Sequence, residues 1–100
     1  MEKTIKSSII NEMYKCLICG SYRNIEIHHI FDGCNKENSI KYGLIVPLCS
    51  YHHTESSKAV HGRDGYMLDL ELKRLGQKAF EWKYTREEFI ERFGENYLCE

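Results

Sequence analysis

The chain has 100 residues, which is enough for one compact domain with a single core. Hydrophobic residues make up 42% of it and charged residues 29%, with one proline, and this excludes a disordered chain or a low-complexity linker. The formal net charge of −1 argues against a strongly basic nucleic-acid coat, so any contact with DNA must be local.

The longest uncharged apolar stretch, Tyr42 to Cys49, is far shorter than the roughly 20 residues that a membrane-spanning helix needs. The first ten residues lack the apolar segment of a secretory signal. We therefore expect a cytoplasmic protein with no membrane partner, formed by residues 1–100 as one domain.

The first half of the chain predicts one helix and a hairpin. Isoleucine and methionine residues recur on one face of Thr4–Tyr14, as in a short amphipathic helix. Asn24–Phe31 alternates apolar and polar residues and predicts a strand. The polar segment Gly33–Ser39 predicts a turn, and Tyr42–Leu48 predicts a returning strand that ends at Pro47.

The second half of the chain predicts three helices. Ser50–Val60 contains few helix breakers and predicts a short one. Apolar residues recur at steps of four and three across Met67–Lys83, up to and including Trp82, and this is the strongest helical pattern in the sequence. A final helix begins where Thr85 and Glu88 form a capping box, and it ends at Gly94.

Five cysteines and five histidines are the most informative part of the composition. Cys16 and Cys19 form a C-x2-C pair, and Cys49 and His52 form a C-x2-H pair, which together supply the four ligands of a tetrahedral zinc site. An odd number of cysteines with no secretory signal weakens a disulfide interpretation. A zinc that only stabilises the fold, in a protein without chemistry of its own, is the simpler alternative.

The other histidines gather around the predicted hairpin. His28 and His29 are adjacent on a strand, so their side chains point to opposite faces, and one can bind a metal while the other acts as a general base. His53 follows the zinc ligand His52 directly and can deliver a ligand to a second metal, which His61 could join. Glu26 is expected to share the strand face of His28 and to orient it.

The motifs CLIC, EIHHIF and PLCSYHH occur in the order seen in HNH endonucleases, and residues 16–62 resemble the zinc-stabilised form of that family found in phages and prophages. The tail from ELKRLGQKAFE to TREEFIERFGENYL, residues 71–98 of a C-terminal helical extension over about residues 66–98, is also similar to small phage-encoded proteins of this group. The resemblance implies an α+β fold in which a ββα-metal (His-Me finger) core, held by a zinc knuckle, is flanked by N-terminal and C-terminal helices.

The resemblance also implies a role for each histidine. His29 becomes the general base that activates water, and His28 and His53 become ligands of the catalytic divalent cation, with His61 as a further candidate. Cys16, Cys19, Cys49 and His52 become the structural zinc ligands. A cation held mainly by imidazole is expected to be Mn²⁺, Ni²⁺, Co²⁺ or Zn²⁺ rather than Mg²⁺, although Mg²⁺ remains a candidate in the cell.

One position departs from the family pattern. Leu44 occupies the place where members with this knuckle commonly carry the middle asparagine of the motif. Asn35 or Asn38, between the two predicted strands, can replace that asparagine in orienting His29, and we prefer Asn35. The departure affects the expected catalytic efficiency more than the fold.

The expected function is a metal-dependent DNA endonuclease or nickase of low sequence specificity, acting on double-stranded or branched DNA in phage or prophage DNA processing. Lys36, Lys41, Lys58 and Arg63 flank the site and are candidates to hold the DNA backbone. The alternative is a catalytically weak, zinc-dependent DNA-binding or adaptor module on the same scaffold.

Overall fold

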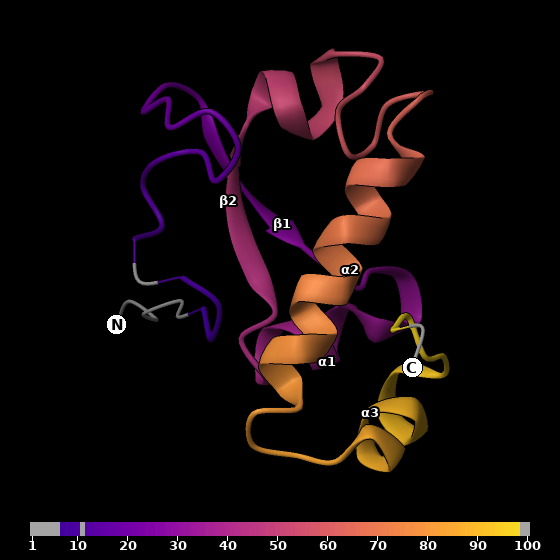
Figure 1. The fold of residues 1–100 in the computed structure, drawn as a ribbon. Helices are drawn as coiled ribbons and strands as arrows, with labels where there is room; N and C mark the ends of the chain where they lie inside the picture. The colour runs from indigo at the N-terminus through magenta and orange to yellow at the C-terminus, as the bar shows by residue number, and fades with distance from the viewer. Residues whose placement is uncertain (1–6, 11, 99–100) are drawn as a thin grey trace.

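The computed structural model describes residues 7–10 and 12–98, and in this part of the chain it is a small α+β protein (Figure 1). Its elements are the strands β1 (Ile25–His29) and β2 (Ile45–Cys49) and the helices α1 (Lys36–Lys41), α2 (Tyr66–Phe80) and α3 (Arg86–Phe93). A 3-10 turn (Gly33–Asn35) precedes α1, and a single π-helical turn (Tyr51–Glu55) follows β2. No helix in the described residues is long and apolar enough to cross a membrane.

The two strands form an antiparallel sheet, which confirms the predicted hairpin. Ile25 pairs with Cys49 at one end and His29 pairs with Ile45 at the other. All five residues of β2 are buried, whereas in β1 only His28 is buried, Glu26 is exposed and the other three residues are partly buried. The prediction that Pro47 ends the second strand is wrong, because Pro47 lies inside β2, where a two-stranded sheet leaves an edge that tolerates a missing N–H.

The connection between the strands is helical, and the prediction of a simple turn over Gly33–Ser39 is wrong. Ser39 of α1 is fully buried, and its hydroxyl donates to the main-chain oxygen of Phe31 (2.6 Å) and accepts from its N–H (3.0 Å). These bonds satisfy the main chain just beyond β1, where pairing with β2 has ended. A long-range contact therefore decides the conformation of this polar segment.

The predicted N-terminal helix over Thr4–Tyr14 is also wrong for the part that the structure describes, because residues 7–10 and 12–14 are not helical. The Ser7 hydroxyl donates to the carbonyl of Ile45 (2.7 Å), and the Ser8 N–H donates to Gly43 (2.8 Å). Serine side chains that bond to main chain compete with helix formation, and here the partner is the start of β2. Residues 4–6 and 11 of that prediction lie outside the described residues.

Helix α2 crosses the sheet and closes the core, but with only part of its predicted apolar stripe, because Leu72 is buried whereas Leu75 is 38% exposed (Figure 1). Gly76 lies at the closest approach: a Cβ there would meet the Phe31 ring at 3.1 Å and the Ile30 side chain at 3.2 Å. The glycine costs the helix about 1 kcal/mol relative to alanine but lets it pack against the end of β1. The helix ends at Phe80, so Trp82, predicted to belong to the buried stripe, is 88% exposed.

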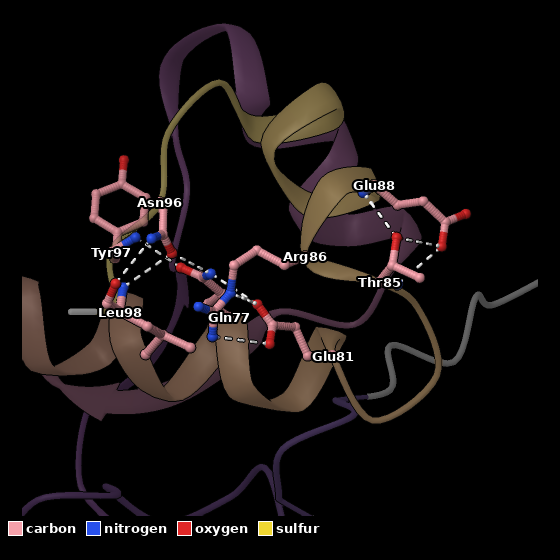
Figure 2. A network of polar contacts seen from close by, with 8 residues as sticks. All are labelled: Gln77, Glu81, Thr85, Arg86, Glu88, Asn96, Tyr97 and Leu98. Atoms are coloured by element: carbon pink, nitrogen blue, oxygen red, sulfur yellow. Dashed lines mark hydrogen bonds and ion pairs between the residues drawn. The ribbon is translucent and has the colours of Figure 1, made fainter. Parts of the chain in front are cut away.

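The part of the core between α2 and α3 is aromatic, and a network of hydrogen bonds around Gln77 stabilises it (Figure 2). Gln77 is fully buried, donates to Asn96 (2.7 Å) and Glu81 (2.8 Å), and accepts from the N–H of Tyr97 (2.8 Å). The capping box of Thr85 and the left-handed Gly94 (φ 88°) bound α3 as predicted. This arrangement holds the C-terminal segment against α2.

Candidate metal centres

Four predicted zinc ligands come together at one end of the sheet: Cys16, Cys19, Cys49 and His52. The Sγ atoms of Cys19 and Cys49 are 3.8 Å apart, and the Nδ1 of His52 lies 3.3 Å from Cys49 Sγ and 3.8 Å from Cys16 Sγ. A tetrahedral zinc with Zn–S of about 2.3 Å and Zn–N of about 2.0 Å spaces its ligand atoms by about 3.5–3.8 Å. The four residues therefore fit a metal ion of zinc type.

Local structure fixes each pair of ligands. The first pair is carried by a tight turn in which the Gly20 N–H donates to Cys16 (2.9 Å), with Gly20 at a φ of 77° that favours glycine. The Leu17 N–H donates to the carbonyl of Pro47 (2.9 Å), so this turn is attached to the outer edge of β2. The second pair spans the end of β2 and the π-helical turn that follows it.

The main chain around Cys16 favours the thiolate that a metal requires. Burial by itself disfavours the charged form, but N–H groups of Cys49, Cys19 and Ile18 outweigh it and lower the pKa of Cys16 to about 6. The Ile18 N–H, for example, lies 3.4 Å from the sulfur. A thiolate is the form that binds metal, so Cys16 is suited to be a ligand of a metal ion at neutral pH.

A second cluster, which we call the histidine cluster, is formed by His28, His53 and His61. One ligand nitrogen from each lies within 4.8 Å of the others, and the ring centroids are 4.8–5.4 Å apart. The π-helical turn presents His53, and the His61 N–H donates to the His53 carbonyl (3.0 Å), which brings the two rings onto the same side. The prediction that these three residues can share a metal fits this geometry.

In the described part of the chain, His28 is buried without the hydrogen bonds that a buried histidine normally makes. Its side chain is 1% exposed, and within the described residues neither ring nitrogen has a hydrogen-bond partner. Burial, reinforced by the charges of His61 and His53, lowers the pKa of His28 to about 3, so the ring is neutral. A neutral imidazole with an unsatisfied nitrogen aimed at two further imidazoles is suited to bind a divalent cation.

Glu26 contacts a different histidine from the one expected. Its Oε1 lies 2.6 Å from the Nδ1 of His53, not against His28. Strand alternation correctly places Glu26 and His28 on the same face, but the π-helical turn brings His53 over that face and in reach of the carboxylate. This bond directs the other ring nitrogen of His53 away from Glu26.

His29 lies on the opposite strand face from His28 and is partly buried. Burial lowers its pKa, the charges of Lys36 and His53 lower it further, and Asp32 acts in the opposite direction. His29 is therefore neutral at pH 7 and lies within electrostatic reach of His53. A neutral imidazole at this position has the protonation state that a general base requires.

The asparagine that should orient His29 stays a prediction. The side-chain amide of Asn35 donates to the carbonyl of Phe93 (3.2 Å), and that of Asn38 donates to the carbonyl of Arg92 (3.0 Å). Both amides thereby attach the connection between the strands to the end of α3. Leu44 is fully buried in the core.

The four basic residues expected to flank the site are all exposed: Lys36, Lys41, Lys58 and Arg63. Their contacts differ: the charge of Lys36 acts on His29, whereas Lys41 lies over the ring of Tyr42. Arg63 is 3.5 Å from Asp64. Lys36 is thus the one of the four whose charge reaches the candidate general base.

Comparison of the chain with protein-family models, with curated proteins and with solved structures finds no match. The resemblance to HNH endonucleases therefore depends on the motifs themselves. The described residues contain a cysteine and histidine cluster and a small ββα-like arrangement, which are compatible with that resemblance.

Proposed function

We propose that the protein is a metal-dependent DNA endonuclease or nickase with a ββα-metal core. The observation that carries the proposal is the buried His28, whose ring nitrogens have no hydrogen-bond partner among the described residues and whose ring lies beside those of His53 and His61. A structural zinc protein without chemistry has no need for this second group of ligands, since burying an unsatisfied imidazole destabilises the fold.

Hydrolysis of a phosphodiester needs a base that makes the nucleophile and a positive charge that stabilises the dianionic transition state. His28, His53 and His61 would hold a divalent cation, which would supply that charge near the scissile phosphate. His29 takes a proton from water as the water oxygen bonds to phosphorus and the bond from phosphorus to the leaving oxygen breaks. Lys36, whose charge acts on His29, is the candidate to contact an adjacent phosphate.

The chemistry of the donor set indicates which ions to test. Three imidazoles suit Mn²⁺, Ni²⁺, Co²⁺ or Zn²⁺ better than Mg²⁺, which prefers oxygen ligands and keeps its water. A domain of 100 residues with a net charge of −1 has few groups to read bases, so we expect low sequence specificity on double-stranded or branched DNA. The phage and prophage setting is a part of the proposal that depends on the motif resemblance.

The test is conversion of supercoiled plasmid to nicked and linear forms by zinc-loaded protein with added Mn²⁺, Ni²⁺ or Mg²⁺. We expect nicking that requires the added ion, and nicking at least about 100-fold slower from His29→Ala protein purified in parallel, which controls for a contaminating nuclease. DNA that is shifted on a gel but intact under every ion would contradict the proposal. That result would favour the zinc-dependent DNA-binding or adaptor module.

A further inference from the structure

An open groove of about 710 Å³ lies at the C-terminal half of α2, between that helix, the start of the described chain and the residues after α1. Its floor is aromatic: Tyr42 packs edge-on against Phe80 with ring centroids 5.1 Å apart, and Phe80 stacks on Tyr84 at 4.6 Å. The metal centres use none of these residues, and no sequence motif points to them.

The described charged residues that line the groove are all positive. Lys41, Lys78 and Lys83 line it, and none of its described lining residues is acidic. All three lysines are exposed. In a chain with a net charge of −1, three lysines around one concave surface make a local site for an anion.

Trp82 gives the groove a flat, accessible ring. It follows the end of α2, lines the groove and is 88% exposed, which is unusual for the largest apolar side chain. Lysines beside exposed aromatic rings are the combination that binds single-stranded nucleic acid, since phosphates contact the lysines while bases stack on the rings. An acidic peptide would use the lysines but has less use for an exposed indole.

We propose that this groove binds a single-stranded segment of the DNA on which the protein acts, an inference that rests on the proposed function. A duplex hides the faces of its bases in the stack, so only an unpaired segment can place a base on Trp82. The substrate class is then DNA with a single-stranded part, such as a flap, fork or gap, next to the site of cleavage.

The distance to the histidine cluster suits such a substrate. His61 precedes α2 in the chain and the groove is lined by residues of the C-terminal half of α2, so the two sites are separated by about the length of this 15-residue helix. A helix of that length spans about 22 Å. A strand of about ten nucleotides is long enough to reach from one site to the other.

The experiment uses the fluorescence of Trp82, the single tryptophan of the chain, in zinc-loaded His29→Ala protein without added cation. A ten-nucleotide oligothymidine should quench the emission and saturate, and a blunt duplex of equal length should bind at least about tenfold more weakly. The double variant Lys78→Gln/Lys83→Gln should weaken binding by about tenfold or more and reduce the slope of log affinity against log salt by about 1.4. Lys15→Gln, which removes a lysine outside the groove, should bind like the parent.

Several results would overturn this inference without touching the proposed function. Equal affinity for duplex and single strand, or no effect of the lysine pair, would show that the groove does not select an unpaired segment. Quenching by polyglutamate but not by the oligonucleotide would assign the groove to an acidic protein segment. Conversely, a chain that fails to nick plasmid under any ion but shows the expected quenching would reject the nuclease and retain the groove as a binding site for single-stranded DNA.

Discussion

The carboxylate of Glu26 lies 2.6 Å from the Nδ1 of His53, joining the first strand to the π-helical turn across 27 positions of sequence. In this pair the carboxylate fixes the ring orientation and the tautomer of the histidine, so the Nε2 is the nitrogen left to bind a cation. Glu26 is thus a positioning residue for the histidine cluster, and its contribution can be separated from that of the ligands.

Replacing Glu26 by Gln should raise the concentration of Mn²⁺ or Ni²⁺ needed for half-maximal nicking by about 10- to 100-fold. The maximal rate at saturating ion should change far less, because His29 is untouched. Glu26→Asp should lie between the parent and Glu26→Gln. The exposed Glu87 on α3 provides the matched control, and an equal effect of Glu87→Gln would remove the assigned role of Glu26.

Removing a zinc ligand should unfold the domain. Cys16→Ser and Cys49→Ser each break the four-ligand cluster, and structural zinc sites contribute directly to folding free energy. We expect one equivalent of zinc in the purified parent by elemental analysis, and loss of both zinc and the circular dichroism of the fold in the variants. Cys34→Ser changes an exposed thiol outside the cluster and should do neither. A parent protein that keeps its fold without metal would contradict the zinc assignment.

The histidines should differ in their response to added cation. His29→Ala should keep its fold and its affinity for the cation while nicking about 10²- to 10⁴-fold more slowly at every ion concentration. His28→Ala and His53→Ala should recover part of their activity at high ion concentration, because they lose occupancy rather than the base. His61→Ala tests the third ligand in the same way. A His29→Ala protein that nicks like the parent would require another base.

His28 should weaken the fold as pH falls. Its pKa is about 3 in the folded protein against an ordinary value of 6.5, so between these values the unfolded chain binds the proton more strongly. The free energy of unfolding therefore rises with pH across this window and falls on acidification. His28→Leu should remove this dependence. The free energy of unfolding, measured by urea denaturation, should then change less between about pH 5 and pH 7 than it does in the parent. Added Mn²⁺ or Ni²⁺ should stabilise the parent but not the variant, and equal stabilisation of both would place the ion elsewhere.

The capping box of α3 offers a test of stability without chemistry. Thr85 accepts from the Glu88 N–H (3.0 Å), and the Glu88 carboxylate accepts from the Thr85 N–H (2.9 Å). Thr85→Ala should lower the free energy of unfolding by about 1 kcal/mol, measured by urea denaturation. Nicking at 25 °C should be unchanged, and a loss of activity at full folding would mean that α3 acts on the site.

Residue identity and spacing alone determined the metal ligands and the strongly periodic elements. The C-x2-C and C-x2-H pairs each place two candidate ligands in one short segment, and the capping box of α3 depends on neighbours within a few residues. Such local features can be predicted from the sequence because each pair of ligands, or each cap, lies within one turn of the chain.

The tertiary structure decided the features whose partners are distant in sequence. The Ser39 hydroxyl folds a polar segment into a helix because it completes the main chain beyond β1, and Ser7 and Ser8 hold the described N-terminal residues along β2 instead of in a helix. Glu26 meets His53 only because a π-helical turn crosses its strand face. These contacts depend on which polar groups are buried and need a hydrogen-bond partner. That is known only once the elements are packed together.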